Sequence, residues 1–185
     1  MLRENKVEYG IFLTPQMGRP DGAELATRLT TLNTQTKTGM RLINHFALSD
    51  AAPTPLAVSI ETKSSATDTM KGNVQLANWV RAHYRQLAVV AGLKAQQCTG
   101  THGEHGGATL IPSLLVPMLP LVFVSGTIWR VDFALRRDNK TIIYTGPNVG
   151  NTHTLDGCYR ACAAIRRLAE WAQEDYMAWW MEILS

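Results

Sequence analysis

The sequence predicts an α/β fold, in which strands and helices pack around one core. Residues 6–13 and 56–63 alternate between apolar and polar side chains, as strands do. Residues 68–91 and 151–183 place apolar side chains at helical spacing. Because 185 residues with 45% hydrophobic content are enough for one well-buried core, we predict a single domain over residues 1–185.

The first part of the chain is predicted to form a strand, a helix and a second short strand, joined by turns and loops. Residues 6–13 predict a strand with Glu8 on its more polar face. After a turn, Asp21 is placed to cap a helix that ends near Leu32. Residues 41–46 predict a short strand, and a proline-containing loop follows at residues 49–55.

The strand at residues 56–63 is the most informative feature. Its apolar side chains point to one face, whereas Glu61 and Lys63 point together to the other. Charges at the end of so apolar a strand must compensate each other, reach water or hold a ligand. An ion pair at the surface is the simplest of these alternatives.

The second half continues the alternation of helices and strands. The helix at residues 68–91 carries Gln75 on the side near Lys63, and Gly92 is a helix-stop signal. A glycine-rich loop is expected after it. Three further strands follow, with a hairpin turn at residues 138–140: residues 119–125, 127–135 and 141–144.

The last element is predicted to be one long amphipathic helix from residue 151 or 152 to Ile183. Its apolar side is expected to include Leu155, Cys158, Tyr159, Cys162, Ile165, Leu168, Ala169, Trp171 and Ala172. The end of the helix is unusually aromatic. Such rings either close the core or form the seam of a homodimer.

Composition limits the functional classes. The net charge is +3, but only 18% of residues are charged, so the support for a nucleic-acid partner is weak. The uncharged stretch at residues 106–129 contains three prolines, which disfavour a membrane helix. Three cysteines cannot all pair, and residues 1–6 lack an apolar signal core, so an intracellular location in cytoplasm or nucleus is expected.

Glu8 and Glu61 are candidate ligands for a metal ion. Two carboxylates and the main-chain carbonyl of Thr62 suit a hard cation such as Mg²⁺ or Mn²⁺. Lys63 would then orient water or stabilise charge on phosphorus, and Gln75 would position Lys63 or the substrate. Asp50 is the rival for the first acid, although its proline-rich loop favours a turn role.

These residues give the chain a family resemblance. Glu61-Thr62-Lys63 after Ala57-Val58-Ser59-Ile60, with Gln75 in the next helix, resembles the PD-(D/E)xK nuclease superfamily. The resemblance is closest to nuclease-like domain proteins of filamentous fungi, and extends to the closing run from Val149-Gly150-Asn151-Thr152 to Trp180. It implies a mixed central sheet that carries Glu8 and Glu61 and is flanked by the Gln75 helix and the C-terminal helix.

The resemblance implies two functions of different classes. The first is divalent-metal-dependent hydrolysis of phosphodiesters in DNA. The family pattern has Asp where this chain has Glu8, and residues that normally precede this strand are not seen. Both departures favour the second function, a scaffold without nuclease activity. It would act as a metal-independent enzyme on a small, secondary-metabolite substrate, or as a binding module.

Overall fold

A mixed six-stranded sheet forms the centre of the protein. The computed structural model describes residues 9–14, 20–35, 43–44, 54–64, 68–99, 116–137 and 140–185. Its strands are β1 (Tyr9–Phe12), β2 (Leu56–Lys63), β3 (Leu119–Ser125), β4 (Ile128–Arg137), β5 (Lys140–Tyr144) and β6 (Asn148–Asn151). They follow the order β1-β2-β3-β4-β5, and β6 pairs with β4. Because β2 and β3 are parallel and the other pairs antiparallel, the predicted mixed sheet is confirmed.

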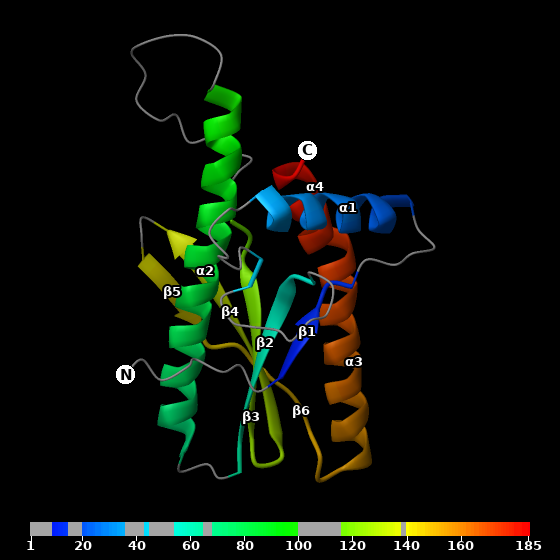
Figure 1. Ribbon diagram of the computed structural model, residues 1–185. Helices are drawn as coiled ribbons and strands as arrows, with labels where there is room; N and C mark the ends of the chain where they lie inside the picture. Colours follow the sequence, from blue (N-terminus) through cyan, green and yellow to red (C-terminus); the bar gives the residue numbers. More distant parts are fainter. Residues whose placement is uncertain are drawn as a thin grey trace.

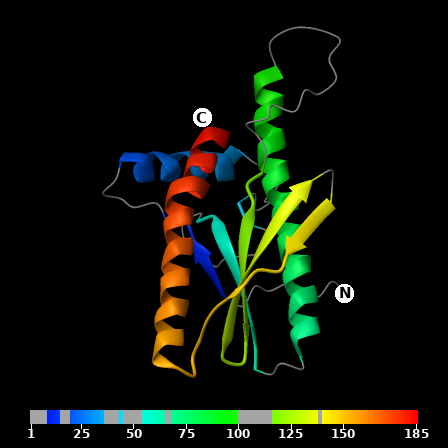
Figure 2. The same cartoon turned by 180° about the vertical axis from the view of Figure 1, so that it is seen from behind.

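Helices cover both faces of the sheet (Figures 1 and 2). They are α1 (Pro20–Gln35), α2 (Thr69–Thr99), α3 (Leu155–Trp171), a π-helical turn η3 (Ala172–Tyr176) and α4 (Met177–Ile183). Helix α2 lies on one face and α3 on the other, and α1 crosses one end of the sheet beside α4. Arg28 of α1 fixes this crossing, since it donates to the Met181 carbonyl at 3.1 Å.

The core is continuous between the sheet and its helices. Leu56, Val58 and Val122 of the sheet are fully buried, as are Leu87 of α2 and Trp180 of α4. Burying such large apolar side chains stabilises the fold by roughly 1.5–3 kcal/mol each. The strands at residues 56–63 and 119–125 have the predicted bounds.

Tyr84 connects α2 to the sheet through its hydroxyl group. The hydroxyl donates to the Ala134 carbonyl at 2.7 Å and lies 3.1 Å from the Pro117 carbonyl. It also accepts from the backbone N–H of Leu119 at 3.3 Å. Burial raises the pKa of Tyr84 to about 12, because the phenolate would lose its hydration.

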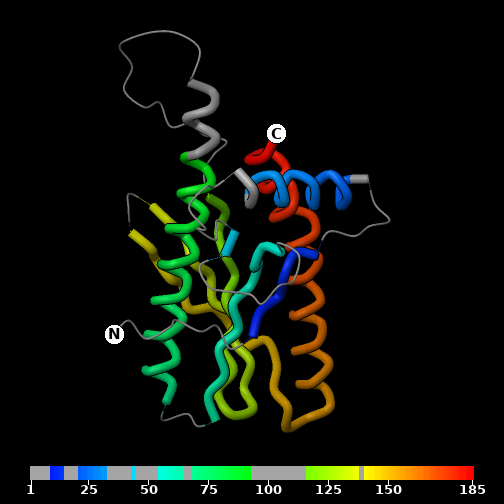
Figure 3. Tube along the Cα trace, in the orientation of Figure 1, coloured from blue at the N-terminus to red at the C-terminus, as the bar shows by residue number. Residues whose placement is uncertain are grey.

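The C-terminal helix differs from the prediction at its start. Asn151 accepts hydrogen bonds from the backbone N–H groups of His153 and Thr154, which holds residues 152–154 in a turn. The helix then begins at Leu155, with Thr154 as its N-cap at 3.0 Å from the Gly157 nitrogen. Figure 3 shows this turn between β6 and α3.

The predicted apolar face of this helix is also partly wrong. Leu155 and Tyr159 are 74% and 69% exposed, and Cys162 is exposed. The helix instead approaches β6 through small residues. A Cβ atom on Gly150 would lie 2.5 Å from the Ala161 nitrogen, so only a small-residue face fits there.

The helix is interrupted by the π turn at residues 172–176, which the sequence analysis did not predict. Steps of four residues drift by about 40° around an α-helix. The wider π turn absorbs this drift and keeps Ala172, Tyr176 and Trp180 buried on one side. Tyr176 stacks on Trp171 at 5.5 Å and meets Trp180 edge-on at 6.2 Å, and the buried rings of Tyr176 and Trp180 are part of the core.

Four other elements differ from their predictions. Helix α2 continues through Gly92 to Thr99, because an interior glycine costs only about 1 kcal/mol relative to alanine. Helix α1 begins at Pro20, so Asp21 lies in its first turn and is not its cap.

The described part of the predicted strand at residues 41–46, Ile43 and Asn44, is not a strand. The Asn44 side chain instead bridges Thr54 and Leu56, at 2.8 Å each. Strand β6 was not predicted. In the described residues, no helix has both the length and the apolar character needed to cross a bilayer.

Candidate active site

Strand β2 brings Glu61 and Lys63 together on the face that α2 covers. The Glu61 side chain is 0% exposed and that of Lys63 is 17% exposed. An ion pair joins the Lys63 Nζ atom to the Glu61 Oε1 atom. The Glu61 carboxylate is thus withdrawn from water, and the neighbouring Lys63 ammonium compensates its charge. The pair is not fully buried, because Lys63 keeps partial contact with solvent.

The end of β2 is held in place by the turn between β3 and β4. The backbone N–H of Gly126 donates to the Lys63 carbonyl at 2.7 Å. Gly126 has a φ angle of +57°, which glycine adopts without a steric penalty. Thr62, between the two charged residues, lies opposite Val124 of β3.

Helix α2 supplies the third member of the site. The Lys63 Nζ atom donates to the Oε1 atom of Gln75 at 3.2 Å. One turn earlier, Gly72 lies so close to the sheet that a Cβ atom there would be 2.3 Å from Phe123 and 3.2 Å from Lys63 Cγ. The absent side chain of Gly72 therefore allows α2 to approach and places Gln75 over Lys63.

Arg130 and Asp132 on β4 extend this polar face of the sheet. The Arg130 guanidinium lies 4.9 Å from the ring centroid of Phe123, the β3 neighbour of Glu61. It donates to both carboxylate oxygens of Asp132, at 2.8 and 2.7 Å, and to Asn73 of α2 at 2.8 Å. Asp132 also accepts from the Gly146 nitrogen at 3.0 Å. This cluster holds the beginning of α2 against the sheet.

Sequence reasoning missed the pair formed by Arg130 and Asp132. The signal was present, because the two residues are separated by one position on a predicted strand, the same spacing as Glu61 and Lys63. Their connection to Asn73 could not be read from local spacing, since it joins residues 57 positions apart.

The structure brings together four of the six expected site residues. Glu61, Thr62, Lys63 and Gln75 lie together where β2 meets α2, whereas Glu8 and its rival Asp50 lie outside the described residues. The described ranges contain no group of three or more His, Cys, Asp or Glu side chains that could hold a metal ion. The oxygen donors of Glu61 and Thr62 fit a hard cation by type.

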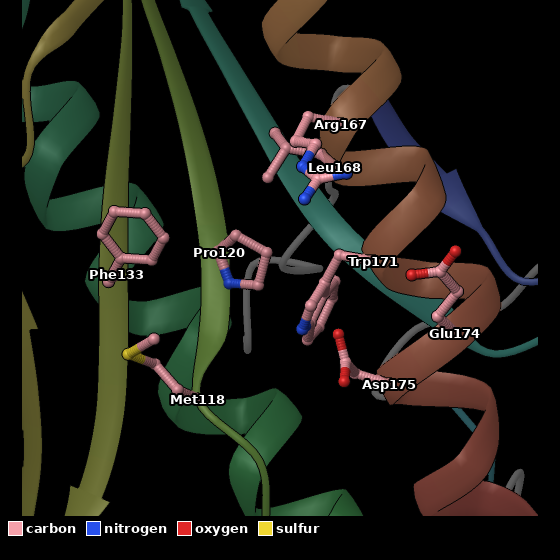
Figure 4. Close-up of a pocket in the computed structure, with 8 residues that line it drawn as sticks. All are labelled: Met118, Pro120, Phe133, Arg167, Leu168, Trp171, Glu174 and Asp175. Carbon is pink, nitrogen blue, oxygen red and sulfur yellow. The ribbon is translucent and has the colours of Figure 1, made fainter.

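A cavity of about 300 Å³ lies on the opposite face of the sheet, between α3 and the strands β3 and β4 (Figure 4). Its walls are formed mainly by Pro120, Phe133, Leu168 and Trp171, and charged side chains come from Arg167, Glu174 and Asp175. Because Pro120 and Phe133 alternate with residues of the Glu61 face, this cavity is separate from the Glu61 site.

Comparison with known proteins identifies the family. A sequence model described as the PD-(D/E)XK nuclease superfamily matches residues 3–177. Neither the curated proteins nor the solved structures gave a match. The matched residues include all strands of the sheet, and Glu61, Lys63 and Gln75 among them.

Proposed function

This chain belongs to the PD-(D/E)XK nuclease superfamily, and on this premise we propose that it is a divalent-metal-dependent hydrolase of phosphodiester bonds in DNA. The observation that carries the proposal is the connection of Glu61, Lys63 and Gln75 at the end of β2. A directed ammonium can stabilise charge that develops during attack on phosphorus, and a neighbouring carboxylate can hold a metal ion.

The proposal assigns the metal to Glu61, the carbonyl of Thr62 and Glu8. Tyr9 pairs with Ile60 in the antiparallel ladder of β1 and β2. Glu8 is assigned from the sequence alone: it directly precedes β1, and it lies outside the described residues. A bound Mg²⁺ or Mn²⁺ ion would supply a Lewis acid and a more acidic water molecule.

Lys63 and Gln75 provide the part of the chemistry that belongs to the chain itself. An ammonium has three N–H donors, and its contacts with Glu61 and Gln75 fix the direction of the group. Lys63 can therefore orient the attacking water or stabilise the negative charge that develops on the phosphoryl oxygens. Gln75 acts through Lys63 as a positioning residue.

The proposal is tested by cleavage of linear duplex and single-stranded DNA with Mg²⁺, Mn²⁺ or EDTA. We expect Glu61→Gln and Lys63→Ala to lower cleavage about 10²-fold or more. Arg160→Gln, an exposed change on α3, is the control. Equal cleavage by wild type and both site variants would contradict the proposal.

A second readout does not depend on activity. Mn²⁺ should raise the midpoint of thermal unfolding of wild type, because a ligand that binds the native state stabilises it. It should not raise the midpoint of Glu61→Gln. If Lys63→Ala does not fold, Gln75→Ala replaces it in the cleavage assay, because that variant keeps the Glu61–Lys63 ion pair.

A second candidate function is the binding or metal-independent conversion of a small molecule. The cavity beside Trp171 favours it, since about 300 Å³ is at the lower limit of ligand pockets and the walls are mainly apolar. Ligand-detected NMR with small aromatic compounds tests this candidate. Trp171→Ala should abolish such binding, and compounds that bind both proteins equally would argue against the cavity.

A further inference from the structure

An open groove of about 700 Å³ runs between α2 and the β4–β5 hairpin, away from Glu61. Figure 1 shows β5 beside α2 on this side of the molecule. Four of its lining residues are basic, two from the helix and two from the strands: Arg81, Arg85, Arg136 and Lys140. Among the described residues, no carboxylate lines the groove.

This grouping of positive charge differs from the basic side chains on the described parts of α1 and α3. On α1 and α3, basic side chains pair with an acid one turn away, as Arg28 does with Glu24 and Arg160 with Asp156. Arg81 and Arg85 instead lie one turn apart on α2, where like charges destabilise a helix by roughly 0.2–0.5 kcal/mol. A bound polyanion would relieve this repulsion.

The side chains indicate the chemistry of the ligand. A guanidinium group presents a planar set of donors that matches two phosphate oxygens, and the positions of Arg81 and Arg85 are about 6 Å apart along the helix. The groove is open, which suits an extended chain of phosphates better than an enclosed small anion. Asn78 and Thr141 add neutral polar side chains to the same walls.

Helix α2 also carries Gln75, which contacts Lys63. Gln75 precedes Arg81 by six residues, or about 9 Å of helix. We propose that the groove binds the phosphodiester backbone of a nucleic-acid strand that flanks the phosphate at the Glu61 site. This inference rests on the proposed function, which identifies the bound strand as DNA. The positive charge of the groove is an independent observation.

The test measures binding of a fluorescent 20-nucleotide DNA, single-stranded and duplex, in EDTA at several KCl concentrations. In Arg81→Gln/Arg85→Gln, the slope of log K against log salt should become shallower by about 1.4 for the single strand and 1.8 for the duplex. Affinity at 100 mM KCl should fall about tenfold or more. Arg160→Gln/Arg166→Gln removes the same charge from α3 and should leave the slope unchanged.

Three outcomes would overturn the inference. They are an unchanged slope in the groove variant, an equal change in both double variants, and loss of binding to vesicles containing phosphatidylserine without loss of DNA binding. Hydrolysis of bis(p-nitrophenyl) phosphate with Mn²⁺ separates this inference from the proposed function. A wild type without hydrolysis would contradict the nuclease assignment, while the binding measurement would still decide whether the groove holds DNA.

Discussion

The Nζ atom of Lys63 lies 3.2 Å from the Oε1 atom of Gln75, so a hydrogen bond joins the last residue of β2 to the second turn of α2. The two residues are separated by 12 positions in the sequence. The bond orients an ammonium that is also paired with the buried Glu61. The hydrogen bond therefore contributes more to the orientation of the Lys63 ammonium than to the stability of the fold.

Substitution of Gln75 should separate these two contributions. We expect Gln75→Ala to lower DNA cleavage about tenfold, or roughly 1.4 kcal/mol in transition-state free energy, because Lys63 loses its hydrogen bond to Gln75. The free energy of unfolding should change by no more than about 1 kcal/mol. Gln173→Ala, at an exposed position of the π turn, is the matched control and should leave both cleavage and urea unfolding unchanged.

Removing only one charge of the Glu61–Lys63 ion pair should lower the free energy of unfolding. Lys63→Met leaves the Glu61 carboxylate buried without its ammonium, so we expect a loss of about 3 kcal/mol in unfolding free energy. Glu61→Gln/Lys63→Met removes both charges and should be less destabilised than Lys63→Met. Urea unfolding of wild type, both single variants and the double variant at pH 7 gives the interaction energy. Additive effects of the two single substitutions would show that the pair is not coupled.

Tyr84 predicts a loss of stability in alkaline solution. Its pKa is about 12 in the folded protein and about 10 in the unfolded chain, so the folded state holds the phenolic proton more tightly. The resulting stabilisation is complete below pH 10 and is lost as the pH rises from 10 to 12. Two pKa units correspond to about 2–3 kcal/mol.

Urea unfolding between pH 8 and pH 11.5 measures this effect. Tyr84→Phe loses the hydrogen bond to Ala134, so it should be less stable than wild type by about 1–2 kcal/mol at pH 8. The difference in unfolding free energy between wild type and Tyr84→Phe should become smaller at high pH. Burial also raises the pKa of Tyr176, so Tyr84→Phe should keep part of the alkaline dependence. Parallel profiles of the two proteins would contradict the role of Tyr84.

The strands of the sheet could be predicted where local pattern and tertiary environment agree. β2 and β3 are apolar runs bounded by proline or polar turns, and their predicted limits match the structure. β6 could not be predicted in this way, because Asn148–Asn151 contains a glycine and two asparagines. It is a strand because it pairs with β4 and accepts the close approach of α3.

The candidate site was predictable to a similar extent. Strand alternation was enough to place Glu61 and Lys63 on one face, and the following helix suggested Gln75. The basic groove was not predictable, because its charges come from α2, β4 and β5 and are distant in the sequence. The exposure of Leu155 and Tyr159 was missed because close packing at Gly150 selects the small-residue face of α3.

Gly72 and Gly92 offer a test of how α2 positions Gln75, because the two glycines occupy the same helix in different surroundings. A Cβ atom on Gly72 would lie 2.3 Å from Phe123 Cε2 and 2.8 Å from its Cζ atom, so α2 or the ring must move. A Cβ atom on Gly92 would meet nothing within 4 Å.

We expect Gly72→Ala to destabilise the protein by about 1–3 kcal/mol through overpacking, and to lower DNA cleavage because Gln75, one turn later, moves away from Lys63. Gly92→Ala should stabilise the protein by roughly 0.5–1 kcal/mol, because alanine favours the helical backbone, and should leave cleavage unchanged. Thermal and urea unfolding with cleavage assays of both variants measure these effects. Gly72→Ala could also be destabilised and still cleave DNA at the wild-type rate. In that case the substitution has shifted the helix without disturbing the contact between Gln75 and Lys63, and the close approach of α2 serves packing alone.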